Sequence, residues 1–299
     1  MALVVSGLTD YVNVHRDELL VKAAADSKTL RFVDLMPGVK SEDAIPYLSS
    51  TVVLDDGSNC GFEAKGEDVF TDRKIKTSAV KVNKEFCWKD FEKKYANYQL
   101  LWEAGRETLP FEQKIADANL MAIQKEVEDL VWNGNSAITV DGYLKQISQV
   151  DSASTVAVTG LTSASTTSQI IKAVVKAIPG AALKKGVNLF LSHTAFNAYV
   201  AEQNETCCAN KAVIDAASET LQYVGDSRIT LIPVEGLESS GAFVAASKDA
   251  LVYGTDIEGS EGEYKMWYSE DNDKFRLRVL FRAGTALRWP DEIAYYIPA

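Results

Sequence analysis

Ser192 and His193 stand next to each other where a buried strand is expected to lead into a helix. A serine hydroxyl beside an imidazole can act as a nucleophile with its general base. Serine at such a turn is also a preferred N-cap, because its hydroxyl accepts a hydrogen bond from the first helical turn. Adjacent side chains rarely point at each other, so the capping role is the better interpretation. The sequence contains no G-x-S-x-G, G-x-x-x-x-G-K-[ST] or G-x-G-x-x-G motif. We therefore predict no catalytic residues and a protein that is not an enzyme.

The residue types that bind metals are present but are not spaced as ligands. The two histidines, His15 and His193, lie far apart, and the four cysteines form no C-x-x-C. The segment 254–273 holds seven carboxylates and one lysine, but it does not match the ordered spacing of a calcium loop. We expect a solvated turn there, free thiols in a reducing compartment, and neither a metal nor a cofactor.

The composition is that of a folded soluble protein. Of 299 residues, 46% are hydrophobic and 24% are charged, which is enough apolar material for a core. No apolar run reaches the roughly 18 residues of a membrane span, and the first residues do not resemble a secretory signal. The net charge of −11 argues against non-specific wrapping of nucleic acid, which requires many contacts from basic residues to phosphate.

Three helices are predicted in the first half of the chain. Asn13 can cap a helix that continues to about residue 26, with acidic residues in its first turns. Residues 88–105 carry an aromatic stripe at helical spacing, which indicates a core-facing helix. Residues 109–135 predict a longer amphipathic helix of about 35 Å. Thr108 can cap it, Pro110 suits its first turn, and Asn133–Asn135 are expected to end it.

A charged β-ribbon is predicted between the first two of these helices. Residues 30–50 are extended chain interrupted by two prolines, and the following residues alternate around a glycine-containing turn. Residues 50–70 have five acidic residues against Lys65, a net charge of −4. Residues 71–94 have eight basic residues against four acidic ones, a net charge of +4. An isolated hairpin is marginal in water, so it is either a solvated surface hairpin or a ribbon that orders against another subunit.

The second half predicts an α/β unit followed by a long hairpin. Strands and helices alternate over residues 144–256, with a buried strand at Val187–Leu191. Residues 263–289 predict a β-hairpin that turns near 270–273. Its second strand alternates apolar and basic residues, so one side faces the core and the other is largely basic. The last residues, 292–299, predict a final strand.

This order of elements resembles the major capsid proteins of tailed bacteriophages, the fold named for phage Hong Kong ninety-seven and shared with encapsulins. The similarity extends to the segments VNLFLSHTAFNAYV, AFVAASKDALVYGTD and NDKFRLRVLFRAGTALRWPDEIAYY. It implies an α+β fold with these parts: an N-terminal arm (1–49), an extended β-loop (50–85), a peripheral domain with the long spine helix (86–140), an α/β axial domain (141–261), the β-hairpin of the peripheral domain (262–286), and a C-terminal strand that returns to the axial domain (287–299).

The resemblance implies a structural protein of the virion that assembles, in the bacterial cytoplasm, into pentamers and hexamers of an icosahedral or prolate shell. The shell would enclose double-stranded DNA without sequence-specific binding. Implied partners are portal and scaffolding proteins and a possible decoration protein, with no membrane. The candidate subunit contacts are charged residues of the ribbon and the hairpin: Asp55, Asp56, Glu63, Lys65, Arg73, Lys74, Lys76, Lys81, Arg276 and Arg278.

Two other functions are compatible with parts of the sequence. An encapsulin-type compartment shell has the same fold but encloses cargo enzymes, and the first residues here do not resemble the arm of that family. An α/β enzyme or ligand-binding protein would need a pocket in residues 144–256. Packaged DNA would exclude the compartment shell, and a projecting ribbon on a flat wedge would exclude the enzyme.

Overall fold

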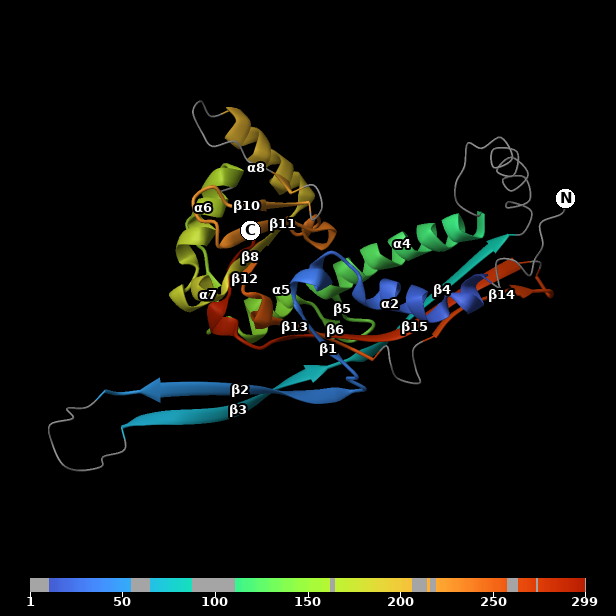
Figure 1. The fold of residues 1–299 in the computed structure, drawn as a ribbon, viewed down its shortest axis with the longest axis horizontal. Helices are drawn as coiled ribbons and strands as arrows, with labels where there is room; N and C mark the ends of the chain where they lie inside the picture. The colour runs from blue at the N-terminus through green and yellow to red at the C-terminus, as the bar shows by residue number, and fades with distance from the viewer. Residues whose placement is uncertain are drawn as a thin grey trace.

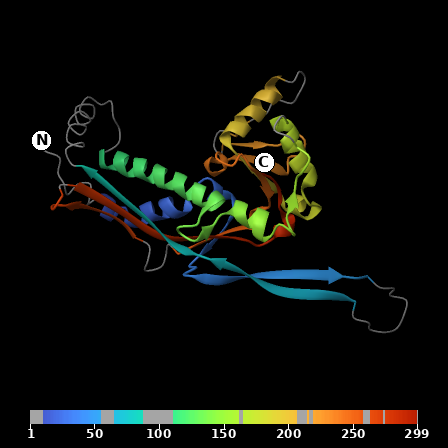
Figure 2. The ribbon, with the colours of Figure 1, turned by 180° about the vertical axis from the view of Figure 1, so that it is seen from behind.

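The computed structural model describes residues 11–54, 65–87, 111–161, 165–205, 214–215, 219–256, 263–272 and 274–298. The chain is elongated, with two β-sheets beside each other and a two-stranded ribbon that projects from the body (Figures 1 and 2). Within these ranges, no helix has the length and apolar character that a membrane crossing requires.

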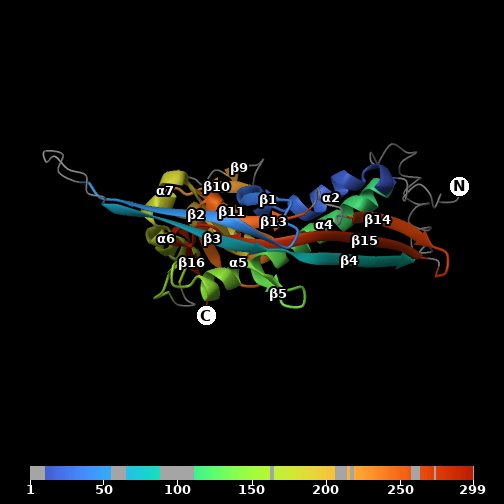
Figure 3. The same cartoon turned by 90° about the horizontal axis from the view of Figure 1, so that it is seen from below.

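The first sheet has five strands arranged around one long strand. Strands β13 and β14 pair antiparallel with β15, β4 pairs antiparallel with β15 as well, and β1 pairs parallel with β13. Their bounds are β1 (Asp34–Pro37), β4 (Ser78–Cys87), β13 (Leu251–Thr255), β14 (Glu263–Ser269) and β15 (Lys274–Leu287). Helices α2 (Arg16–Ala25) and α4 (Phe111–Asn133) lie together on one side of this sheet (Figures 1 and 3).

The core between this sheet and its helices confirms the predicted patterns. Along β15, the side chains of Phe275, Leu277, Val279 and Phe281 are at most 1% exposed. Opposite them, α4 buries residues at helical spacing: Leu120, Ile123, Val127, Leu130, Val131 and Trp132. The predicted alternation of β15 and the predicted apolar side of the long helix therefore meet in one core.

The predicted end of α4 is confirmed, whereas the predicted start of α2 is wrong. Helix α4 ends at Asn133, within the predicted segment 133–135, and the φ of +75° at the following residue, Gly134, favours glycine. The predicted cap of the first helix is wrong, because Asn13 belongs to a helical turn that precedes α2. Helix α2 begins after His15, whose φ of −102° and ψ of 17° interrupt the helix. The predicted helix 88–105, Thr108 and Pro110 lie outside the described residues.

The second sheet has seven strands in the order β7-β16-β12-β8-β11-β10-β9. The strands are β7 (Val156–Ala157), β8 (Val187–Leu191), β9 (Ile214–Asp215), β10 (Thr220–Gln222), β11 (Ile229–Pro233), β12 (Phe243–Ala246) and β16 (Ala294–Tyr296). Three helices accompany it: α6 (Thr167–Ala177), α7 (Gly180–Lys185) and α8 (His193–Glu205). The strand predicted at Val187–Leu191 is confirmed, and the last strand pairs with β12 and β7.

Short elements join these two units. They are the two-stranded pair β5 (Gly134–Asn135) and β6 (Val140–Asp141), helix α5 (Tyr143–Lys145), the π-helical turn η2 (Gln146–Val150), and the 3-10 turns η1 (Thr29–Phe32), η3 (Glu235–Leu237), η4 (Lys248–Ala250) and η5 (Pro290–Glu292). The resemblance groups residues 141–261 as one domain. The pairing places β13 with β15 in the five-stranded sheet and β12 in the seven-stranded sheet.

Glu128 of α4 connects the spine helix to both units. Its side chain is buried and accepts hydrogen bonds from Thr29 N (2.8 Å), Thr29 Oγ1 (3.1 Å) and Glu235 N (3.1 Å). Trp132, one turn further, donates its indole N–H to Thr29 Oγ1 at 2.8 Å. Glycine is required at position 236, because a Cβ there would lie 2.5 Å from the Glu128 carbonyl oxygen. One carboxylate thus satisfies donors from η1 and η3.

Replacing Glu128 with alanine should lower the free energy of unfolding by about 3 kcal/mol, because buried backbone N–H groups lose their acceptor. The matched control is Glu126→Ala on the same helix, where the exposed side chain should contribute less than about 0.5 kcal/mol. Urea unfolding followed by circular dichroism measures both. Equal midpoints for the two variants would show that Glu128 does not hold the units together.

Candidate assembly surfaces

The most prominent surface feature is the ribbon formed by β2 (Glu42–Val52) and β3 (Gly66–Lys76). The two strands pair antiparallel from Glu42↔Lys76 to Val52↔Gly66. At about 3.3 Å per residue, a strand of this length spans roughly 36 Å. In Figures 1 and 2 the ribbon extends beyond the two sheets, and among the described residues no third strand joins it. The paired strands thus span residues 42–76, whereas the resemblance implied a loop over 50–85, and β4 belongs to the sheet.

The ribbon is held at its base by a backbone crossing. Strand β3 continues through Thr77 into β4, and this segment passes directly over Gly254 and Gly284. A Cβ at Gly254 would lie 2.7 Å from Ile75 Cδ1, and one at Gly284 would overlap the Lys76 carbonyl oxygen. Thr77 donates its N–H to the Ser41 carbonyl (2.8 Å) and its hydroxyl to the Val39 carbonyl (2.9 Å). The close approach therefore requires glycine at position 284, and the two hydrogen bonds that Thr77 donates hold the crossing segment in place.

Side chains reinforce the same junction. Ile45 and Ile75, one from each ribbon strand, are fully buried in a small apolar cluster with Val39, Val252 and Ala286. Arg73 donates to both carboxylate oxygens of Asp151 (2.8 and 3.0 Å) and to the Leu287 carbonyl (3.0 Å). The hydrogen bonds with Asp151 raise the pKa of the Arg73 guanidinium. A bidentate arginine contact fixes orientation as well as distance.

Aromatic contacts tie the ribbon to the seven-stranded unit. The ring of Tyr47 lies 4.8 Å from that of Trp289, and Lys185 Nζ lies 4.9 Å from the centre of the Trp289 ring. Lys185 is also paired with the buried carboxylate of Glu292 at 2.6 Å, and Glu292 accepts from the Ser247 hydroxyl at 2.7 Å. The base of the ribbon is therefore oriented against α7 and η5 as well as against the sheet.

Beyond this anchored base, the ribbon exposes large apolar side chains. Phe70 is 78% exposed and its cross-strand partner Leu48 is 47% exposed. Other exposed apolar residues toward the tip are Val52, Val53, Leu54 and Val69. A contiguous exposed apolar patch on a soluble protein typically marks an interaction site.

The structure separates the predicted contact residues into several places. Asp55, Asp56 and Glu63 lie outside the described residues. Lys65 is exposed beside the ribbon tip, whereas Arg73 is half-buried in its contact with Asp151. Lys74 and Lys76 approach Glu42 of the same ribbon at 2.6 and 3.9 Å, and the hydrogen bond from Lys74 lowers the pKa of Glu42.

The remaining candidates lie on the five-stranded sheet, on the side away from α4. Lys81 is exposed on β4. Arg276 pairs with Glu85 at 2.9 Å and Arg278 approaches Glu263 at 3.5 Å. The hydrogen bonds from Lys274 and Arg276 lower the pKa of Glu85.

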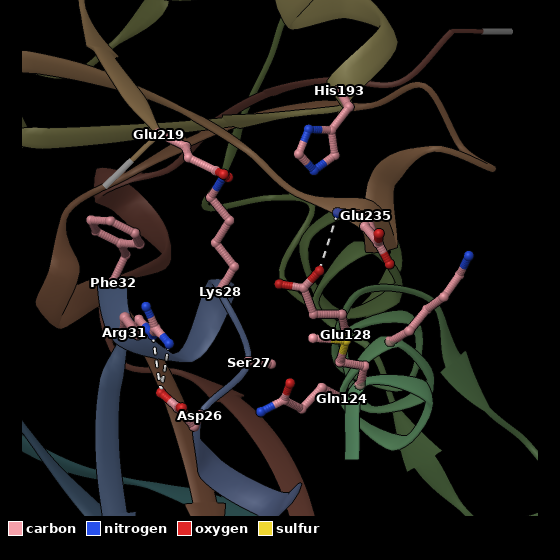
Figure 4. A pocket seen from close by; sticks show the side chains of 12 residues that line it. Asp26, Ser27, Lys28, Arg31, Phe32, Gln124, Glu128, His193, Glu219 and Glu235 are labelled. Carbon is pink, nitrogen blue, oxygen red and sulfur yellow. Dashed lines mark hydrogen bonds and ion pairs between the residues drawn. The ribbon is translucent and has the colours of Figure 1, made fainter. Parts of the chain in front are cut away.

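A hollow that His193 lines does not resemble a catalytic site. It is a groove of about 640 Å³ between η1, α4 and the seven-stranded unit (Figure 4). Four of its charged groups form two ion pairs, Lys28 with Glu219 at 2.9 Å and Arg31 with Asp26 at 2.9 Å. His193 reaches the groove, but Ser192 Oγ accepts a hydrogen bond from Ala195 N at 3.1 Å, which confirms the predicted cap. Across the described ranges, no group of three metal-binding side chains is close enough to hold an ion.

Sequence reasoning missed the groove and its central residue, Glu128. The residues that Glu128 contacts are about a hundred positions away in both directions. A glutamate in an amphipathic helix gives no sequence signal that distinguishes it from an exposed one.

Comparison with solved structures identifies the fold. No protein-family model matches the sequence, and no curated protein matches it. A chain of the satellite phage P4 procapsid that includes the size determination (Sid) protein aligns with a TM-score of 0.63 and 10% identity, over 96% of this chain and 94% of that chain. A chain from Mycobacterium phage Ogopogo aligns with a TM-score of 0.58 and 14% identity, over 90% and 91%. The capsid of an empty GTA particle aligns with a TM-score of 0.53 and 10% identity, over 93% and 90%.

The chain therefore has the α+β fold of phage major capsid proteins, and the predicted fold class is confirmed. The alignments cover nearly the full length of each partner, so the whole subunit shares this architecture.

Replacing Arg73 with alanine should release the ribbon base, because Asp151 and the Leu287 carbonyl lose their shared donor. In hydrogen-exchange measurements, the amides of β2 and β3 nearest the body should exchange about tenfold faster, while those of α4 stay unchanged. Lys74→Ala is the control, since its exposed pair with Glu42 lies within the ribbon and contributes little. Unchanged exchange in the Arg73 variant would contradict the anchoring role.

Proposed function

We propose that this protein is the major structural subunit of a phage shell. The ribbon is the observation that carries the proposal: it is firmly held at its base yet presents exposed apolar residues that no described part of its own chain covers. Such a surface is stabilised when another copy covers it. The shared fold with phage capsid chains makes a repeated subunit the natural partner.

In this function the chain acts by repetition of many modest contacts. Closed symmetry means that each surface patch meets its complement around every axis, so a weak contact is multiplied over the whole shell. We propose pentamers and hexamers, a DNA-filled virion assembled in the host cytoplasm, and portal, scaffolding and decoration proteins as partners. The net charge of −11 is compatible with DNA that is enclosed without extensive contacts from basic residues to its phosphates.

We propose the predicted charged residues of the ribbon and the hairpin as subunit contacts, with the exception of Arg73. Arg73 already has a well-formed partner within its own chain, so its role is to orient the ribbon. The exposed cations, such as Lys81, are available to a neighbour. No catalytic step is part of the proposal.

The purified protein, with its scaffold if one is needed, should form shells, tubes or capsomers in negative-stain electron microscopy. The double variant Leu48→Ser and Phe70→Ser should fold normally, because both side chains are exposed, yet form at least about tenfold fewer particles. Met121→Ser is the matched control, an apolar side chain that is 70% exposed on α4 instead of on the ribbon.

A well-folded wild-type chain that stays monomeric under all assembly conditions would contradict the proposed function. Normal particles from the double variant would instead show that Leu48 and Phe70 of the ribbon do not contribute to the assembly contact.

A further inference from the structure

The groove between η1, α4 and the seven-stranded unit has features of a binding site that the proposed function does not use (Figure 4). Its volume of about 640 Å³ is within the range of roughly 300–1,000 Å³ that ligand sites occupy. Ser27, Gln124 and Glu128 line it from the side of η1 and α4, and His193 and Glu235 line it from the seven-stranded unit. A ligand held in this groove therefore contacts both units of the subunit.

The carboxylate of Glu128 is a buried negative charge without a positive partner. The residue is 4% exposed, and its three hydrogen bonds come from uncharged donors, the N–H and hydroxyl of Thr29 and the N–H of Glu235. Within the described part of the chain, no basic side chain forms an ion pair with it. Buried charges in proteins are normally paired. Because a carboxylate has about four acceptor positions, Glu128 can still accept a hydrogen bond from a cation in the groove.

A second polar group of the groove is unsatisfied. Ser27 is 3% exposed, and its hydroxyl has no hydrogen-bond partner among the residues that the structure describes. Leaving a buried hydroxyl without a partner costs free energy, because the group has lost its hydrogen bonds to water. Ser27 and Glu128 line the same groove, so one ligand with several N–H donors can satisfy both.

The charge that remains after the internal ion pairs of the groove is negative. The pairs of Lys28 and Arg31 with their carboxylates cancel. Glu128 and Glu235 then stand against Lys125, two negative charges against one positive charge. Glu235 and Lys125 are exposed, and neither forms an ion pair with another described residue. The groove therefore favours a cationic ligand over an anionic one.

We propose that this groove binds a basic side chain, best an arginine guanidinium, that a partner polypeptide presents. A guanidinium carries five N–H donors in one plane. The groove supplies the acceptors: the carboxylates of Glu128 and Glu235, the hydroxyl of Ser27 and the side-chain oxygen of Gln124. Met121, which lines the groove and is 70% exposed, offers an apolar surface to the aliphatic part of the arginine side chain.

Occupancy of the groove stabilises the joint between the two units. Glu128 already holds the N–H groups of Thr29 in η1 and of Glu235 in η3. A cation between these elements offsets the buried charge at their common acceptor. The site belongs to a single subunit, so it goes beyond the proposed function and exists whether or not shells form.

The probe is N-acetyl-arginine amide, and its control is N-acetyl-citrulline amide, which has the same shape without the charge. Titration of the full chain labelled with nitrogen-15 should move the indole N–H resonance of Trp132, because that group donates to Thr29 beside Glu128. The shift should saturate with a Kd of about 1 mM, as for a single small ligand. The citrulline probe should bind at least about tenfold more weakly, because it does not offset the buried charge. Inorganic phosphate should not compete.

Variants of the groove test the sign of the charge that it accepts. Glu235→Gln should weaken binding of the arginine probe about tenfold, and Ser27→Ala about threefold. Both should fold normally, because Glu235 is exposed and the hydroxyl of Ser27 has no described partner to lose. Lys125→Gln removes a competing cation and should tighten binding about threefold. Glu126→Gln is the control on the same helix, exposed and outside the groove, and should leave binding unchanged.

Four results on the free subunit would overturn the site: no saturable shift, equal binding of the two probes, unchanged binding by the Glu235→Gln variant, or weaker binding by the Lys125→Gln variant. The last result would assign the groove to an anion instead. None of these measurements requires assembly, so a wild-type chain that fails to form particles refutes the proposed function and leaves the binding result standing.

Assembly reactions identify the source of the basic side chain. If another copy supplies it, a saturating concentration of the arginine probe should lower the particle yield of the purified protein at least about threefold, and Glu235→Gln should do so without the probe. If a different assembly protein supplies it, that yield stays unchanged and the probe instead reduces co-sedimentation of the assembly protein with the particles. Either result supports the proposal. No effect of the probe in both reactions would overturn the role of a protein partner.

Discussion

The position of the ribbon depends on one backbone crossing, where Lys76 and Thr77 pass over Gly254 and Gly284. A side chain at Gly284 would push the two backbone segments apart, whereas one at Gly254 would meet the side chain of Ile75. Thr77 uses both its N–H and its hydroxyl to hold the neighbouring loop. Thr77 joins β3 to β4 at this point. The residues before Thr77 therefore form a ribbon strand, and the residues after it form a strand of the five-stranded sheet. The direction of the ribbon is thereby linked to the core of the subunit.

A ribbon whose base is already oriented has a physical advantage in assembly. Ordering a loose hairpin on a partner costs conformational entropy that subtracts from the contact energy. Here the bidentate contact of Arg73 with Asp151 and the tilted ring contact of Tyr47 with Trp289 supply that order within the free subunit. The surfaces left open are then apolar and charged in alternation, which suits weak contacts that must be specific and must repeat around symmetry axes.

The features that were predictable from sequence are those set by local periodicity. The long helix that ends at Asn133, the alternating strand β15 and the cap at Ser192 all follow from spacing over a few residues. A two-stranded ribbon was predicted from about residue 50, but its first strand begins earlier, at Glu42. Pro46 does not exclude a strand that, among the described residues, has no partner on its outer edge. What remained hidden depends on distant partners: Asp151 for Arg73, Thr29 and Glu235 for Glu128, and β15 for β13. No spacing rule connects residues so far apart in the chain.

The central claim is that the ribbon is completed by a neighbouring copy of the same chain. A cryo-electron microscopy map of assembled particles, at a resolution that separates strands, tests this most directly. The account predicts that each ribbon lies on an adjacent subunit, with the exposed side chains of Phe70 and Leu48 in contact with that subunit. Particles in which the ribbons project freely into solvent, or fold back on their own subunit, would contradict it.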